Sequence, residues 1–498
     1  MPLRATEIQT PTLALICRQY IAHRDFKAEK FWQLQLTHTK SFTDFKSYSD
    51  LEFESKVQAE EAMKSIQRKG KPTITDVSTE IIQETAPLLY DLTALQKAAN
   101  KKYGFSASET LEIAQGLYEK QFITYPRTGS KYITEDLWTE LPNLIKGLSD
   151  HQEIGEKVSK IRFGKLNKHI VNESKVTDHH GLLVTGKMPS ALSTNENVLY
   201  KMIALRLLEA VSDTCSREKI SSTIQVLHYE FHTKSLHMLE PGWRSIQNEY
   251  DDHELLETDL PELSVGDQLN LAGCEIVEKQ RKGPELFTEA TLLSKMEHPE
   301  SNGLQKNVKQ ALGTVGLGTP ATRAAIIETL LSRQYIERKG RSLLPTAKGE
   351  SVYELVKDMG ISSVGLTIEW EKVLSDIENG KTNEKDFQQK IEAYTREITL
   401  ELLQVKIAIE AVPELLCPKC KVRHLRISEK VIKCPDEKCS WKQFRQVCGI
   451  LLPVDEISNL INDGKTSLLK GMKSKSGKGF SAKLVLTAAA EVQFAFEK

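Results

Sequence analysis

Residues 89–133 hold the most informative stretch of this chain, LYDLTALQKAANKKYGFSASETLEIAQGLYEKQFITYPRTGSKYI. Apolar residues recur at helical intervals from Asp91 to Phe122. Within that range Ser106 stands three residues before Glu109, which is the spacing of a capping box. The sequence therefore predicts a helix that begins near Ser106 and ends near Phe122.

The turn after this helix carries a phenol and a guanidinium two residues apart. Pro126 and Gly129 favour a turn, so we expect Tyr125 and Arg127 at a helix exit and not in a core stripe. A tyrosine oxygen can attack phosphorus, but its ordinary pKa of about 10 calls for nearby positive charge. Arginine supplies that charge to two phosphate oxygens at once. The pattern indicates a phosphate-cleavage pair; a packed tyrosine beside a surface arginine is the structural alternative.

Composition indicates a globular chain of several domains. Its 498 residues exceed one hydrophobic core, and 27% of them are charged. No apolar run approaches the roughly 18 residues of a membrane span, and the opening MPLRATEIQT has no apolar signal core. We therefore expect a cytoplasmic protein without membrane contact.

Charge is segregated along the chain. The net charge is −1, yet residues 417–498 hold 16 Lys and Arg against 8 Asp and Glu, a surplus of 8. The first 416 residues must then carry −9, since −1 less 8 is −9. A basic tail on a mildly acidic body fits a polyanionic partner. The net charge of the whole chain argues against a surface that is basic everywhere.

The tail also concentrates cysteine. Cys417 and Cys420 form one pair, and thirteen residues separate it from a second pair, Cys434 and Cys439. This ligand count and spacing predict a structural four-cysteine zinc site, whose metal supplies folding energy to a short segment. Cys448 is spare and is expected to pack.

Basic and aromatic residues surround these cysteines. Together they would form a face that contacts single-stranded DNA through charge and stacking, although a solvated ribbon surface fits them too. The residues predicted to contact DNA here are Lys419, Arg423, Trp441 and Arg445, with Phe444 among them.

Residues from Thr319 onward predict a winged helix. Thr319 caps a helix that has Pro320 at its first position and runs to about Arg333. A hairpin with Lys339-Gly340 at its tip follows, and a second helix begins at Ala347. The preceding Gly-Leu-Gly would offer backbone N–H groups to a DNA phosphate, but a simple helix start explains it equally well.

Residues 89–133 closely resemble the active-site region of type IA DNA topoisomerases, especially the bacterial topoisomerase III branch. Residues 176–185, VTDHHGLLVT, resemble that family's paired-histidine motif. The matches run nearly the whole chain in the family's order. They include QTPTLALI from Gln9, LFTEATLLSKME from Leu286, VGLGTPATRAAIIETLLSRQYIERKGRSLLPTAKGE from Val315 and TIEWEKVLSDIENGK from Thr367.

The resemblance implies roles for single residues. Tyr125 would be the nucleophile, Arg127 its partner, and His179 a group that hydrogen-bonds the scissile phosphate. Without the resemblance, the two histidines are ordinary surface or capping residues. The residues for which the resemblance favours a DNA contact are Gln9, Thr10, His180, Thr322 and Arg323.

The implied fold is α+β and multidomain, a toroidal clamp followed by a zinc ribbon and a small C-terminal repeat module. A hinged β-rich domain would carry the tyrosine domain, and a helical domain would bind the single strand to be cut. The expected divisions are 1–30 and 285–412 for the helical DNA-binding domain with its winged-helix-like part, 31–78 and 206–284 for the β-rich hinge domain, 79–205 for the tyrosine domain, 413–446 for the ribbon and 447–498 for the repeat module.

The chain departs from the family in its acidic residues. The family's N-terminal toprim domain supplies a cluster for Mg²⁺, and we expect this chain to lack that domain, since it starts after it and no Asp-x-Asp-x-Glu-like cluster occurs elsewhere. Religation should suffer most, because the metal positions the phosphate. In addition, Glu7 replaces a basic residue of the family, and Gly129 replaces an acidic one.

Two hypotheses of function follow. In the first, the chain is an ATP-independent type IA topoisomerase, completed by a separate toprim-containing polypeptide, that cuts one strand through a 5′-phosphotyrosine, passes another and reseals. In the second, it is a catalytically inactive remnant that binds single-stranded DNA. A winged-helix and zinc-ribbon regulator is a weaker third hypothesis, since it leaves the tyrosine stretch unexplained.

Overall fold

The computed structural model describes residues 3–176, 178–247, 260–299, 316–404, 414–428, 430–474 and 478–496. The chain divides into two compact units, residues 1–398 and 399–498. Among the described residues, no helix combines the length and apolar character needed to cross a bilayer.

A six-stranded antiparallel sheet forms one part of the first unit. Its strand order is β3-β4-β5-β2-β1-β6, and the predicted strand at 31–37 is confirmed within β1. Leu34, Phe45 and Phe231 are fully buried in its core, against which helix α2 packs. The elements are β1 Lys30–Lys40, β2 Thr43–Ser49, α2 Lys56–Lys69, β3 Thr73–Glu84, β4 Cys215–Val226, β5 Tyr229–Glu240 and β6 Asn270–Gln280.

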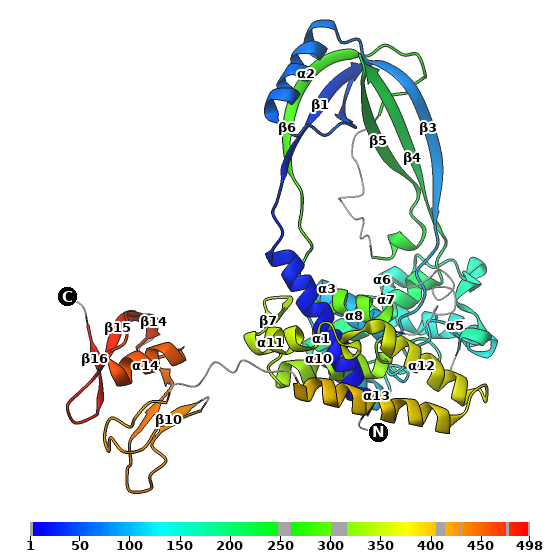
Figure 1. The fold of residues 1–498 in the computed structure, drawn as a ribbon. Coiled ribbons are helices and arrows are strands. Elements are labelled where there is room, and N and C mark those ends of the chain that lie inside the picture. The colour runs from blue at the N-terminus through cyan, green and yellow to red at the C-terminus, as the bar shows by residue number, and fades with distance from the viewer. Residues whose placement is uncertain are drawn as a thin grey trace. The chain divides into compact units, whose positions relative to one another are not determined.

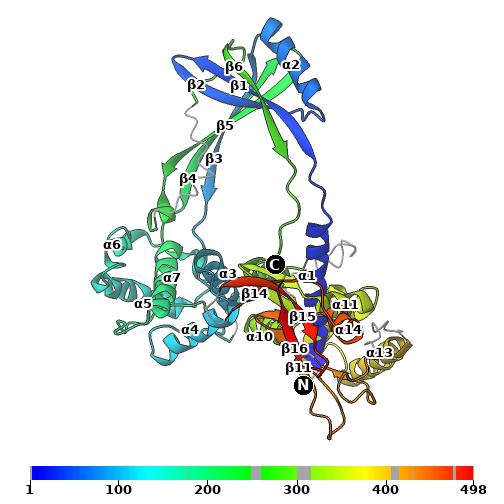
Figure 2. The same cartoon turned by 90° about the vertical axis from the view of Figure 1, so that its left-hand side faces the viewer.

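The chain crosses between this sheet and the helices of the first unit at two separate places. On one side β1 follows α1 and β6 precedes α8, and on the other β3 precedes α3 and β4 follows α7. Figures 1 and 2 show these two sets of segments leaving the sheet toward different helices. The sheet is therefore joined to two groups of helices by separate segments.

The first group of helices, here called the tyrosine part, surrounds a core that includes the fully buried Tyr200. The capping box is confirmed, because Ser106 N donates to Glu109 Oε2 (2.8 Å) and Glu109 N donates to Ser106 Oγ (3.1 Å). That helix ends at Glu119, slightly before the expected end, where Gln121 adopts a φ of 65°. The helices are α3 Leu92–Tyr103, α4 Ala107–Glu119, α5 Glu135–Gly147, α6 Gly155–Val158 and α7 Thr194–Ala210.

The second group, here called the helical part, has its own core of residues from both ends of the first unit, including Leu13, Leu292 and Ile327. The predicted helix, hairpin and helix pattern from Thr319 is confirmed in full. The elements are α1 Leu3–Arg24, α8 Glu289–Glu297, α10 Pro320–Ser332, β7 Ile336–Lys339, β8 Ser342–Pro345, α11 Ala347–Val356, α12 Val364–Glu378 and α13 Glu384–Gln404, the last of which runs into the second unit.

The second unit joins the cysteine-rich segment and the C-terminal module in one core. Cys417, Leu452 and Met472 belong to the same buried cluster, and Trp441 Nε1 donates to Ala490 O across it (2.7 Å). The two segments, divided at residue 446 in the prediction, therefore pack together. The elements are β9 Arg426–Ile427, β10 Val431–Lys433, β11 Lys442–Phe444, β12 Gln446–Val447, β13 Ile450–Leu451, α14 Val454–Asn462, β14 Leu469–Lys473, β15 Gly479–Leu486 and β16 Val492–Ala495.

A buried histidine gives the sheet a pH dependence. His38 on β1 is fully buried, contacts Ser47 Oγ through Nε2 (2.7 Å), and lies 5.2 Å from the ring of Phe45. Burial lowers the pKa of His38 to about 4. Because the unfolded chain takes up this proton near pH 6.5, the stability that neutral His38 contributes is present above that pH and is lost as the pH falls toward 4.

We predict that the free energy of unfolding falls by up to about 3 kcal/mol between pH 7 and pH 4 through this residue. In urea titrations followed by circular dichroism, His38→Gln should have a flatter dependence on pH than the wild type, since its amide reaches Ser47 without titrating. Equal slopes for the two proteins would contradict the assignment.

Candidate active site

Backbone pairing brings the two predicted motifs together. Thr124 N donates to Leu183 O (2.9 Å), and Thr185 N donates to Phe122 O (3.0 Å), so the segment after α4 pairs with the segment after the histidines. The Thr124 hydroxyl also accepts from Leu183 N (3.0 Å). These contacts join residues about sixty positions apart in the sequence and place Tyr125 beside His179.

The ring of Tyr125 contacts two other rings. Its centroid is 4.7 Å from that of His179 and 5.3 Å from that of Tyr118, which it meets edge to face. Tyr125 is half-buried, whereas His179 and Tyr118 are exposed. Such pairs restrict the motion of an aromatic ring beyond what burial of its surface achieves. The phenol is therefore held in place at the protein surface.

Arg127 is exposed two residues beyond the tyrosine, after the buried Pro126. Within the described part of the chain, no hydrogen bond or ion pair occupies its guanidinium. The following Thr128 is buried, and its hydroxyl donates to His179 O (3.0 Å). The loop thus presents an available cation while its threonine anchors the histidine segment.

The loop is fixed to the start of α3. Leu92 N donates to Thr128 O (3.1 Å), and Asp91 caps the helix by accepting from Ala94 N (2.6 Å). The Asp91 carboxylate lies 3.4 Å from Lys131 Nζ. Burial raises the pKa of Asp91, and the charge of Lys131 opposes that shift. This pair ties the far side of the loop to the core of the tyrosine part.

The second histidine is close to the protein backbone. His180 is half-buried, and its Nδ1 lies 2.7 Å from Gly181 O. A Cβ at Gly181 would lie 3.0 Å from Leu89 Cβ and 3.1 Å from the carbonyl carbon of Lys131, so this position has little room for a side chain. By contrast, a Cβ at Gly129 would meet Pro320 Cγ at an ordinary 3.5 Å, so crowding does not require glycine there.

Tyr118 is a site residue that sequence reasoning missed. It precedes Tyr125 by seven residues and lies one position after Leu117, on the side of α4 turned away from the core. The side chain of Tyr118 is 39% exposed. An aromatic residue outside the apolar stripe of the helix, seven residues before a candidate nucleophile, was the signal that could have found it.

The predicted DNA contacts at the helical part differ in their exposure. Thr322 is exposed, and its hydroxyl accepts from Thr319 N (2.9 Å). Gln9 is buried and accepts from Arg333 Nη1 (2.9 Å), while Thr10 is half-buried and has a polar partner. The side chain of Glu7 lies outside the described residues.

Arg323 points into the protein. It is 5% exposed, its Nη1 donates to Thr93 Oγ1 (3.0 Å), and its Nε donates to Leu317 O (3.2 Å). Burial lowers the pKa of Arg323, and the nearby carboxylates of Glu297 and Asp91 oppose that shift. In this structure the guanidinium joins α10 to α3, so a contact with DNA would require its release.

The predicted DNA contacts of the second unit also divide. Lys419 and Arg423 are exposed, and Lys419 Nζ donates to Ser440 Oγ (3.1 Å). Trp441 is only 7% exposed, because its ring packs in the core that the cysteine-rich segment shares with the C-terminal module. Arg445 is half-buried and donates to the carbonyls of Leu452 and Ser428. Phe444, at 58% exposure, is the aromatic ring that this face presents.

The four predicted cysteine ligands converge. Their sulfur atoms all lie within 4.8 Å of one another. The separation is 3.7 Å both between Cys417 and Cys439 and between Cys420 and Cys434. A tetrahedral site with Zn–S bonds of 2.3 Å has sulfur atoms about 3.8 Å apart, so the donor set fits a zinc ion. Elsewhere in the described ranges, no group of three or more His, Cys, Asp or Glu is placed to hold a metal ion.

Comparison with known proteins identifies the family of the chain. The model of the DNA topoisomerase family matches residues 3–389, and a model of the C-terminal repeat of topoisomerase matches residues 438–497. DNA topoisomerase 3 of Bacillus licheniformis is 34% identical over 461 residues, which cover 89% of this chain and 63% of that protein. DNA topoisomerase 3 of Bacillus subtilis is 32% identical, with the same coverage.

The fold has a solved counterpart in full-length topoisomerase I from Thermotoga maritima. The TM-score is 0.61 at 22% sequence identity, and the match covers 88% of this chain and 70% of that one. The chain thus spans about 63% of the length of the curated relatives that it matches. The family match over residues 3–389 and these identities show that the chain belongs to the bacterial type IA DNA topoisomerases and is similar to topoisomerase III.

Proposed function

We propose that this chain cuts one strand of DNA through Tyr125, holds the end while another strand passes, and reseals the break. The main support for the proposal is that the Tyr125 ring contacts both Tyr118 and His179 and lies on a loop in which Arg127 is exposed. Because Tyr125 is half-buried and Arg127 is exposed two residues later on the same loop, we infer that a phosphodiester of a single strand reaches both side chains.

The chemistry would use three side chains. The Tyr125 oxygen attacks phosphorus, the bond from phosphorus to the 3′ oxygen breaks, and the phenolic proton is taken up by the leaving 3′ oxygen. Arg127 neutralises the charge that builds on the phosphate oxygens, and His179 hydrogen-bonds one of them. One phosphate ester replaces another, so the bond energy is conserved and resealing needs no nucleotide.

Strand passage would use the hinge between the two groups of helices. Because the sheet is joined to the tyrosine part and to the helical part by separate segments, bending of the sheet can part them without unfolding either core. We also propose that the chain forms a toroidal clamp around the passing strand and prefers single-stranded DNA. A cytoplasmic location stays a prediction from the sequence.

The Mg²⁺ of the family does not fit the residues seen here. Across the described segments, no acidic cluster is placed to hold it. We propose that a toprim domain on a separate polypeptide supplies this site. The same observation supports a second function, in which the chain binds single-stranded DNA without cutting it.

Trapping of a covalent adduct separates these two functions. With a labelled single-stranded oligonucleotide, Mg²⁺ and a separately expressed toprim domain, the chain should form a covalent adduct that resists denaturant. Tyr125→Phe should abolish the adduct, because it removes the attacking oxygen. The matched control is Tyr132→Phe, a tyrosine of the same loop, which should keep it. Adduct formation without the added domain would contradict the toprim requirement, and no adduct under any condition would support the silent binder.

A further prediction concerns Tyr118. Tyr118→Leu should slow single-turnover cleavage at saturating DNA by roughly threefold to tenfold, because an aromatic pair contributes about 0.5–1.5 kcal/mol to the placement of the Tyr125 ring. Tyr118→Phe keeps the ring and should cleave at nearly the wild-type rate. If both variants cleave equally fast, Tyr118 does not position the nucleophile.

We also propose that the four cysteines hold a structural zinc ion and that the basic face around them contacts single-stranded DNA. Metal analysis of the purified chain should give about one zinc per molecule, and Cys434→Ser should lose it. Cys448→Ser is the control, since this cysteine lies outside the cluster and should leave the zinc content unchanged. A folded wild-type chain without zinc would defeat the assignment.

A further inference from the structure

We propose that the tyrosine part and the helical part hold each other closed by exchanging helix caps, with Glu289 as the positioning residue of this latch. The inference rests on the proposed function, because strand passage needs the two parts to separate and to close again. The contact between them, here called the seam, has α3 and α4 on one side and α8, α10 and the β7–β8 hairpin on the other.

The seam lies between two separate hydrophobic cores. The core of the tyrosine part and the core of the helical part are distinct clusters, and Ala107 is the member of the second cluster that comes from the tyrosine part. Charged and polar groups make many of the contacts across the seam. Lys97 Nζ, for example, lies 2.7 Å from Glu297 Oε2 on α8.

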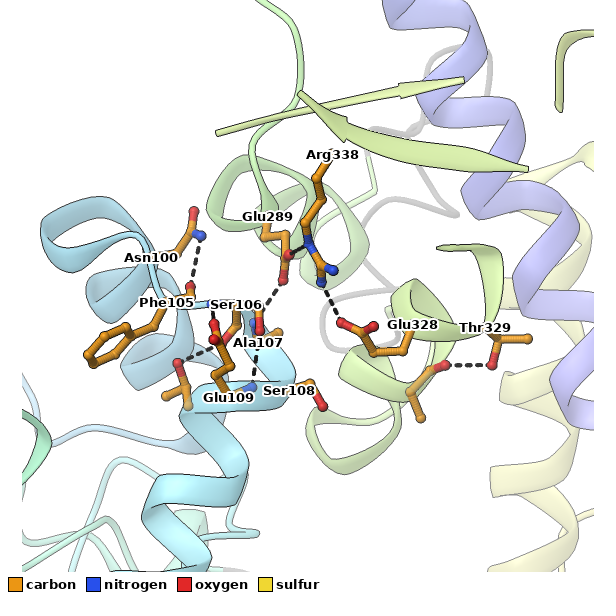
Figure 3. A network of polar contacts seen from close by, with 12 residues as sticks. Asn100, Phe105, Ser106, Ala107, Ser108, Glu109, Glu289, Glu328, Thr329 and Arg338 are labelled. Atoms are coloured by element: carbon orange, nitrogen blue, oxygen red, sulfur yellow. Dashed lines mark hydrogen bonds and ion pairs between the residues drawn. The ribbon is translucent and has the colours of Figure 1, made fainter. Parts of the chain in front are cut away.

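Glu289 completes the N-terminus of a helix in the other part. Although it is a carboxylate, it is only 3% exposed. Its Oε2 accepts from Ala107 N (2.7 Å), the first N–H of α4, and its Oε1 accepts from Arg338 Nε (2.8 Å). Figure 3 shows Glu289 between these two partners, above the Ser106–Glu109 capping box. The capping box leaves the Ala107 N–H for this external carboxylate, and the positive end of α4 favours its charge.

The tyrosine part caps α8 in return. Asn100 on α3 accepts from Ala290 N through Oδ1 (3.1 Å) and donates to Phe105 O through Nδ2 (2.9 Å). Glu289 and Ala290 are the first two residues of α8. One turn of α8 therefore gives a cap to the tyrosine part and receives a cap from it. Parting the seam would break both contacts together.

Polar contacts of this kind suit an interface that opens. When an apolar interface separates, its surface meets water at a cost proportional to its area. When a capped seam separates, the released N–H and carboxylate groups form hydrogen bonds with water instead. A cavity of about 390 Å³ lined by Ser106, Glu112 and Glu289 gives water a place beside the latch. The latch thus fixes the two parts, and Tyr125 with them, in one closed arrangement. The hydrophobic cores of the two parts stay separate.

The test is hydrogen–deuterium exchange of the full chain without DNA, read by mass spectrometry. Glu289→Ala should speed exchange about tenfold or more in the first turn of α4, and also in α3 and α8, because opening of the seam exposes all three. Glu289→Gln keeps an oxygen for Ala107 N and should show a smaller rise. Glu112→Gln, a neutralised carboxylate in the same cavity, is the matched control and should match the wild type.

Two outcomes would overturn the proposal. One is exchange in Glu289→Ala that equals the wild type; the other is a rise confined to the first turn of α4, which indicates a local cap and no latch. If Glu289→Ala fails to fold, the exchange rates of α3 and α8 in Glu289→Gln are compared with those of the wild type in the same way. The measurement needs neither cleavage nor a toprim domain. If the exchange data support the latch but no covalent adduct forms, only the proposed function is contradicted. If an adduct forms but the exchange data show no latch, only this inference is contradicted.

Discussion

The contacts of the Tyr125 ring with Tyr118 and His179 fix the one side chain that the proposed chemistry needs. A phenol on a free loop would sample many orientations, and the entropy of ordering it would oppose every reaction cycle. Here one neighbouring ring comes from α4 and the other from a segment that pairs with the loop through the backbone near Thr124. The core of the tyrosine part thus holds the elements that position Tyr125 at its surface.

The remaining architecture is compatible with the proposed opening, because it can separate the two groups of helices while each keeps its own core. Each group of helices has its own core, the sheet joins them through separate segments, and the seam between them is rich in exchangeable polar contacts. Arg323, Lys97 and Glu289 place their charges at this boundary. Charge that sits inside the seam also explains why Arg323, which the sequence assigned to DNA, is turned away from solvent.

Local patterns could be predicted from the sequence because their physics is local. The capping box at Ser106, the helix start at Thr319 and the spacing of the four cysteines each depend on residues close together in the chain, and all three appear in the structure. The family resemblance also led us to expect Tyr125 and His179 at the same phosphate. What could not be predicted depends on distant partners. Trp441 is buried because it packs against the C-terminal module, where Ala490, forty-nine residues later, accepts its N–H. Tyr118 belongs to the site because the loop after α4 brings Tyr125 back against it.

The central claim is that the Tyr125 oxygen carries the DNA end, and mass spectrometry of the trapped adduct tests it most directly. Trypsin separates the candidates: residues 121–127, QFITYPR, contain Tyr125 alone, while Tyr118 lies in the preceding peptide, residues 103–120. We expect a nucleotide mass on QFITYPR, with fragment ions that place it on Tyr125. A nucleotide on the peptide that contains Tyr118, with QFITYPR unmodified, would contradict it.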